Sequence, residues 1–133
     1  MPKQDDIALA RYKIEKANSC LKASNLLLSE DFYADSANRS YYAIFHAMSA
    51  LFALDGRGFK KHSGVLANFN KDYIKTGLLE VEYAQIAKEA FSLRTQSDYG
   101  EFYVVSKQEV KEQHENAERF VKRIEDFLEE QIK

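Results

Sequence analysis

The chain has 133 residues, a length that predicts a single domain spanning residues 1–133. Hydrophobic residues make up 45% of the chain and charged residues 30%, which excludes a disordered tail and is typical of a soluble globular domain. The formal net charge is −2, so the molecule as a whole is no polycation, and any contact with nucleic acid must use a local basic patch.

The first half of the chain predicts two long helices. From residue 4 to residue 28, apolar residues recur at steps of three and four, which is the helical period. A second helix is expected over residues 32–54, with Asp31 as its N-cap and Asp55-Gly56 as its stop. The single proline, Pro2, interrupts neither helix.

The second half predicts one short helix and two long ones. The short helix begins at Ser63 and ends near Gly77, and a long helix follows over residues 81–98. Ser106 and Glu109 form a capping box at the start of the last helix, which continues to the C-terminus. Because no segment alternates as a strand does, we expect an all-α, up-and-down helical bundle of four long helices plus one short helix.

The first candidate site lies in NRSYYAIFHAMSALFAL, residues 38–54, an apolar run that carries Arg39 and His46. Seven residues at about 100° each place these two side chains about 20° apart on one helix face, near Asn38 and Tyr42. His46 could pack in the core with its nitrogens paired while Arg39 reaches solvent. Alternatively, the pair could bind a phosphate and cleave RNA without a metal, because arginine is a permanent bidentate donor and histidine moves a proton near neutral pH.

A second cluster lies in LRTQSDYGEFY, residues 93–103, where the fourth helix ends. Arg94 and Asp98 are four residues apart, which is the spacing of a helix salt bridge. Tyr99 and Tyr103 crowd the same segment, so the cluster could instead bind a phosphate and stack a base.

A third candidate is the segment before the short helix, where Lys60, Lys61 and His62 are adjacent. Charged loops are usually solvated, but this one is the dense cationic segment of an acidic protein and could contact nucleotide or RNA. The remaining histidine, His114, stands among charged residues and is expected to be a solvated helix residue.

The sequence offers no reason to expect a metal, a cofactor or an export signal. Three separated histidines and one cysteine argue against a zinc site, and no phosphate-binding glycine loop occurs. The cysteine, Cys20, cannot form an intrachain disulfide and is expected to be a buried, inert thiol. The first residues lack an apolar signal core and no segment suits a bilayer span, so a cytoplasmic location without membrane contact is expected.

Four segments in this order resemble the short standalone HEPN-domain proteins of bacteria and archaea, and the similarity covers residues 5–130. They are NRSYYAIFHAMSALFAL, FKKHSGVLANFNKDYIKTGLL, LRTQSDYGEFY and AERFVKRIEDFL. The resemblance implies a helical bundle that pairs into a homodimer. It also implies a metal-independent ribonuclease site of an arginine and a histidine separated by four to six residues, which Arg39 and His46 match. The usual place of that motif is later in the domain, where Asp98 stands four residues after Arg94.

The resemblance further implies a partner, a minimal nucleotidyltransferase that silences the toxin by adenylylating a tyrosine, here Tyr99 or Tyr103. We therefore interpret the chain as an RNase-like toxin in which Arg39 and Arg94 hold phosphate and His46 is general acid or base. Seven residues are expected to contact nucleotide or RNA: Asn38, Tyr42, Lys60, Lys61, His62, Asp98 and Tyr99. The alternative is a non-catalytic nucleotide- or RNA-binding module, or scaffold, that docks on the nucleotidyltransferase.

Overall fold

The computed structural model describes residues 2–99 and 105–133, except the side chains of residues 98 and 99, and within these residues it contains helices and no strands. The elements are α1 (Gln4–Ser29), α2 (Tyr33–Leu54), α3 (His62–Phe69), the π-helix η1 (Asn70–Ile74), α4 (Val81–Tyr99) and α5 (Lys107–Ile132). The expected all-α bundle of four long helices and a short one is confirmed. The predicted helix after residue 62 is correct in place, but it changes to a π-helix for its last turn.

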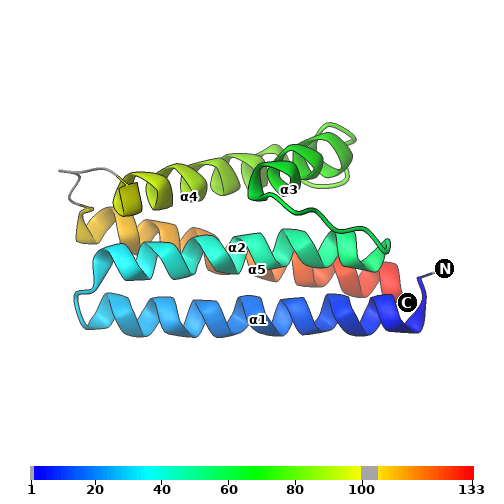
Figure 1. Ribbon diagram of the computed structural model, residues 1–133, viewed down its shortest axis with the longest axis horizontal. Helices are drawn as coiled ribbons and strands as arrows, with labels where there is room; N and C mark the ends of the chain where they lie inside the picture. Colours follow the sequence, from blue (N-terminus) through cyan, green and yellow to red (C-terminus); the bar gives the residue numbers. More distant parts are fainter. Residues whose placement is uncertain (1, 100–104) are drawn as a thin grey trace.

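Helix α2 is the centre of the bundle. In Figure 1, α1, α2 and α5 run along the long axis, and α4 and α3 lie on the other side of α2 from α1. Helix α2 contacts α1, α3, α4 and α5, and it buries residues around most of its circumference, from Ser36 to Leu54. A helix that is apolar nearly all round is stable only when other helices surround it, which explains why this sequence occupies the middle.

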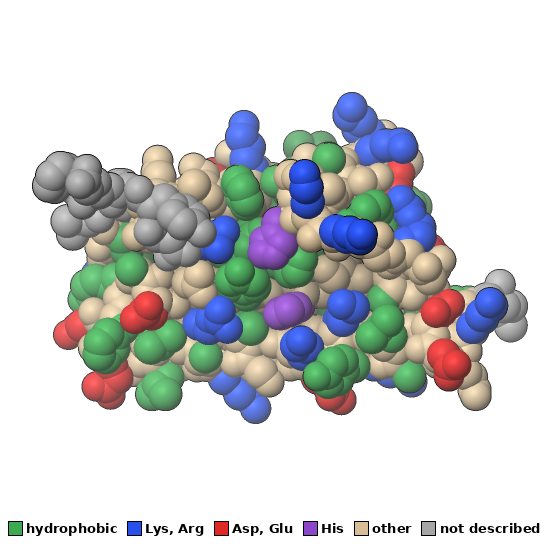
Figure 2. All heavy atoms as spheres, viewed as in Figure 1, with side chains coloured by type: hydrophobic (Ala, Val, Ile, Leu, Met, Phe, Trp, Pro, Cys, Tyr) green, Lys and Arg blue, Asp and Glu red, His purple; other side chains and the backbone are tan. Residues whose placement is uncertain are grey.

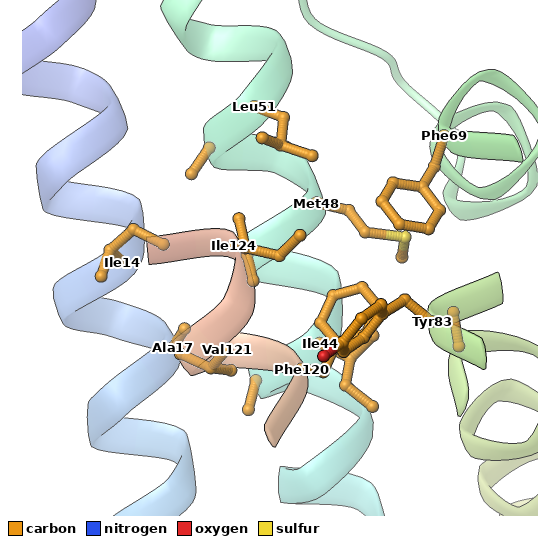
Figure 3. Packing of buried hydrophobic residues seen from close by; sticks show 14 of the residues in the cluster. Ile14, Ala17, Ile44, Met48, Leu51, Phe69, Tyr83, Phe120, Val121 and Ile124 are labelled. Atoms are coloured by element: carbon orange, nitrogen blue, oxygen red, sulfur yellow. The ribbon is translucent and has the colours of Figure 1, made fainter. Parts of the chain in front are cut away.

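The core between these helices is closely packed. Figure 3 shows Ile14 and Ala17 of α1 and Val121 and Ile124 of α5 pointing toward α2. Phe69 and Phe120 are fully buried with ring centres 5.5 Å apart, which fixes α3 against α5. Phe69 thus holds the end of α3 against α5, while His62 at the start of α3 packs on Phe45 of α2 with ring centres 4.0 Å apart.

Asp31 ends α1 and does not cap α2, so the predicted N-cap is wrong. Its φ of 65° is left-handed, its N–H donates to the Leu28 carbonyl (3.1 Å), and the Phe32 N–H donates to the Leu27 carbonyl (2.8 Å). These are the two bonds of a Schellman motif, in which an aspartate can replace glycine. Aspartate is favoured at N-caps as well, and that shared preference misled the sequence argument.

Two other predicted helix ends are confirmed. Gly56 has a φ of 71° after the last turn of α2, and its N–H donates to the Ala53 carbonyl at 2.9 Å. At the start of α5, the Ser106 hydroxyl oxygen accepts from the Glu109 N–H at 3.1 Å.

A buried polar network links α1, α2 and α5. Ser24 Oγ lies 2.6 Å from Ser40 Oγ and 3.0 Å from His114 Nδ1, and the Ser36 hydroxyl donates to the Ser24 carbonyl at 2.8 Å. His114 is only 7% exposed, so the expectation of a solvated residue is wrong. Its position on the stripe of Val110, Ala117 and Val121, all buried, outweighs the charge of its neighbours in the sequence.

Cys20 is buried and free, as expected. None of the helices in residues 2–99 and 105–133 joins the length to the apolar character that a bilayer span requires.

Candidate functional site

Tyr42, on α2, is the centre of a group of cationic and imidazole side chains. Arg39 stands three residues before Tyr42, and its guanidinium carbon lies 4.9 Å from the Tyr42 ring centre. His46 stands four residues after Tyr42, and the two ring centres are 6.2 Å apart. The spacing that placed Arg39, Tyr42 and His46 on one helix face in the sequence is the spacing seen in the structure.

Two further elements bring side chains to the same ring. From α4, the Arg94 guanidinium carbon lies 5.7 Å from the Tyr42 ring centre and 5.4 Å from that of Tyr41. From the first residue of α3, the His62 ring centre lies 5.6 Å from that of Tyr42 and 4.0 Å from that of Phe45. We call Arg39, Tyr42, His46, His62 and Arg94 the Tyr42 cluster. The candidate arginines of α2 and α4 thus belong to one site.

Asn38 orients the first of these arginines. Its side-chain oxygen accepts from Arg39 Nε at 3.2 Å and from Arg39 Nη2 at 2.8 Å. On the other side, Arg39 Nη1 lies 4.0 Å from the Cys20 sulfur of α1. The guanidinium is therefore held between α1 and α2 over the Tyr42 ring, and we assign Asn38 a positioning role toward it.

His46 is half-buried in cationic surroundings. Burial, followed by the charges of Lys16, Lys13 and Arg39, lowers its pKa to about 4. Within the described residues, its ring nitrogens form no hydrogen bond with a protein group. At neutral pH the imidazole is therefore uncharged and can accept a proton or bind an anion through its N–H.

His62 is also held in its neutral form. Burial and the charge of Arg94 lower its pKa. Its Nδ1 lies 2.8 Å from the Tyr41 hydroxyl, and burial raises the pKa of Tyr41 to about 12, so the phenol keeps its proton. A phenol and an imidazole nitrogen can each be the donor of this bond; when Tyr41 donates to Nδ1, the hydrogen of the neutral ring is on Nε2.

The other candidates lie at the edge of the cluster or beyond what the structure describes. Lys60 and Lys61 are exposed directly before His62. Asp98 and Tyr99 end α4, but their side chains are outside the described residues, as is Tyr103. The contact predicted between Arg94 and Asp98 and the roles of both tyrosines stay predictions.

Sequence reasoning missed Tyr41, Lys13 and Lys16. Tyr41 supports both Arg94 and His62, and the two lysines approach His46 from α1. Tyr41 stands beside Tyr42 in the sequence, and Lys13 is seven residues before Cys20, a spacing that returns to the same helix face. These signals become useful only once α1 is known to pack beside Arg39.

The arrangement suits an anion that carries flat rings. Two guanidiniums can share a phosphate, and the aromatic rings between them can stack on a base. Figure 2 shows histidine side chains with Lys and Arg side chains around them on one face of the molecule. Within residues 2–99 and 105–133, no group of three His, Cys, Asp or Glu residues could hold a metal ion.

The sequence profile of the HEPN domain matches residues 10–129. The chain belongs to the HEPN domain family. A "UPF0332 protein" of Thermotoga maritima is 37% identical over 122 residues, which are 92% of each chain. "Putative toxin MJ0605" of Methanocaldococcus jannaschii is 34% identical over 121 residues, 88% of this chain and 87% of that protein.

A solved structure has the same fold. The protein described as TT1696 from Thermus thermophilus aligns with a TM-score of 0.74, over 89% of this chain and 97% of that one, at 19% identity. The expected HEPN membership and the HEPN-like bundle are both confirmed.

Proposed function

We propose that this HEPN protein is a toxin-type endoribonuclease of the cytoplasm that binds RNA at the Tyr42 cluster and cleaves it without a metal ion. The observation that carries the proposal is the approach of Arg39 and Arg94, from two different helices, to the one ring of Tyr42. Family membership and a relative with toxin in its name support the same function.

The chemistry is a transfer within the RNA chain. Neutral His46 takes the proton of a ribose 2′-hydroxyl, the oxygen attacks phosphorus, and the bond to the 5′-oxygen breaks to leave a cyclic phosphate. Arg39 and Arg94 hold the phosphate oxygens and balance the charge that grows on them. The leaving 5′-oxygen then takes the proton that His46 has accepted, and the imidazole returns to its neutral form. His62 lies beside the Tyr42 ring, where it can hydrogen-bond the phosphate.

A second function, binding without cleavage, is favoured by one observation. The pKa values of His46 and His62 are both lowered, so in the free protein neither imidazole carries the extra proton that a leaving oxygen needs. A bound phosphate would raise both pKa values, and cleavage depends on how far it does so.

The direct test is incubation of the purified protein with a labelled oligoribonucleotide, with and without a chelator. We expect the parent to cleave the RNA whether or not the chelator is present. The His46→Gln variant should still bind the RNA but should not cleave it. Arg119→Lys is a matched control, because Arg119 pairs with Glu82 at 2.7 Å on the exposed surface of α5 and α4. Binding by the parent without any cleavage would establish the second function instead.

We also propose the partners that the family resemblance implies, a second copy of this chain and a minimal nucleotidyltransferase. Leu26 and Phe32, at the turn between α1 and α2, are 63% and 56% exposed, and apolar side chains this open suit a protein contact. Light scattering should give about twice the single-chain mass of 15.3 kDa, and a single-chain mass at micromolar concentration would exclude the dimer.

Incubation with the nucleotidyltransferase and ATP should add AMP to Tyr99 or Tyr103, which peptide mass spectrometry would locate.

A further inference from the structure

Helix α1 brings two lysines level with the Tyr42 cluster. It runs beside α2 in the opposite direction (Figure 1), and Cys20 meets Arg39 at 4.0 Å. Lys13 lies seven residues before Cys20, and His46 lies seven residues after Arg39. Both steps are two helical turns, about 10.5 Å, so Lys13 is level with His46 and Lys16 lies between the two levels.

The electrostatics agree with this register. After burial, the charges of Lys16 and Lys13 are the next causes of the lowered pKa of His46, ahead of Arg39. Within residues 2–99 and 105–133 neither lysine forms an ion pair, so their charge is open to a ligand. Both ammonium groups thus extend the positive potential of the cluster across α1.

An exposed ring accompanies the lysines. Lys16 Nζ lies 5.5 Å from the ring centre of Tyr12, and Tyr12 is 55% exposed. Cations and rings therefore alternate across three helices, from Arg94 on α4 through Tyr42 and Arg39 on α2 to Lys16 and Tyr12 on α1. This alternation is the arrangement that proteins use to follow a single strand, with cations on phosphates and rings on bases.

The opposite side of α1 has a different character. There Arg11 pairs with Glu129 of α5 at 3.3 Å, and Glu15 and Glu125 line the same groove. Cations on that side are balanced by carboxylates, whereas Lys13 and Lys16 face a region of arginine and histidine. The charge of α1 is thus divided between two faces.

We propose that Tyr12, Lys13 and Lys16 form the second half of a track for single-stranded RNA, which starts at the Tyr42 cluster and crosses from α2 onto α1. This inference rests on the proposed function, because it requires RNA at the cluster. The lysines hold phosphates beyond the one held by the two arginines, and Tyr12 stacks on a base. The track makes affinity depend on RNA length, which the cluster alone would not.

The test compares long and short RNA. Fluorescence anisotropy is measured with labelled 2′-O-methyl oligouridylates of 12 and 3 nucleotides, which bind but lack the attacking hydroxyl. For the double variant Lys13→Gln/Lys16→Gln we expect about three- to tenfold weaker binding of the 12-mer and less than a twofold change for the 3-mer. The slope of log affinity against log salt should fall by about 1.4, because each lost contact to a single-strand phosphate removes about 0.7.

Matched variants control for fold and for charge. Arg11→Gln removes one positive charge from the balanced side of the same helix and should leave 12-mer affinity within twofold. Lys13→Arg/Lys16→Arg should keep the parental affinity and salt slope. Tyr12→Leu should weaken 12-mer binding about fivefold or more, whereas Tyr12→Phe should not. Circular dichroism melts confirm that each variant is folded.

The outcomes separate this inference from the proposed function. If the parent binds neither oligonucleotide, RNA is not the ligand and the proposed function fails along with the track. If Arg94→Lys weakens binding of both oligonucleotides but the double lysine variant binds the 12-mer like the parent, only the track is overturned. The track is also overturned if the double variant weakens both lengths equally, or if its only defect is in binding an acidic protein.

Discussion

Two of the three histidines, His46 and His114, differ in whether their ring nitrogens are already paired within the protein. His114 is buried, with Nδ1 3.0 Å from Ser24 Oγ and Nε2 3.1 Å from Glu118, so both nitrogens are occupied. His46 is half-buried beside Arg39, Lys13 and Lys16, and its nitrogens make no hydrogen bond to the described protein. His114 therefore joins three helices, while the ring nitrogens of His46 are available to a ligand.

The largest expected effect is the loss of the buried network. His114→Ala removes two hydrogen bonds and leaves Ser24 to its remaining partners in a cavity. We expect destabilisation of about 2–4 kcal/mol and a melting temperature lower by on the order of 10 °C, with RNA affinity per folded molecule unchanged. Reduced affinity in the folded fraction at low temperature would mean that the network also shapes the RNA site.

Next in size is Arg94→Lys, which should act on binding and not on the fold. An ammonium cannot reproduce the planar fork of a guanidinium, so a phosphate should bind about 1.5–3 kcal/mol more weakly, roughly ten- to a hundredfold in Kd. Titration of a labelled oligoribonucleotide at fixed salt measures this change, and a thermal melt measures stability. Equal affinities for variant and parent would remove Arg94 from the site.

A smaller effect concerns the pH dependence of stability. The folded protein holds the pKa of His46 at about 4, below its ordinary value of 6.5, so the unfolded chain binds the proton first as pH falls. The stability contributed by neutral His46 is complete above pH 6.5 and is lost as pH falls toward 4. The free energy of unfolding is measured in urea at pH 7 and at pH 5. Between these pH values His46→Gln should lose about 1 kcal/mol less of it than the parent, after allowance for solvent screening of a partly exposed ring. Identical losses would mean that the ring titrates normally.

The smallest effect should come from Glu118→Gln. The Glu118 side chain is 57% exposed, and an amide oxygen can still accept from His114 Nε2. Stability should change by less than about 0.5 kcal/mol in urea unfolding. A larger loss of stability would show that the buried network depends on the exposed Glu118 carboxylate. The contrast between a buried, fully paired His114 and the more open His46 would then weaken.

The sequence predicted those parts of the molecule that depend on local physics. Helical periods placed every helix, and Gly56 and Ser106 marked ends that the structure confirms. The convergence of Arg39 and Arg94 on Tyr42 could not be predicted, because it depends on how α4 packs against α2. His114 was misjudged because its charged neighbours point elsewhere, whereas the buried face of α5 is set by residues three, four and seven positions away.

The π-helix η1 has a consequence for the angle at which α3 meets the site. Val65, Phe69 and Tyr73 are all buried at steps of four, but an α-helix overshoots a full turn by about 40° in four residues. The wider turn, closed by the bond from the Lys75 N–H to the Asn70 carbonyl at 2.9 Å, turns less per residue and cancels much of that drift. Tyr73 therefore stays on the buried face with Phe69 and stacks on it with ring centres 6.1 Å apart. Deleting one residue from this turn would restore a regular helix and rotate His62 relative to Tyr73 by about 100°, away from Phe45.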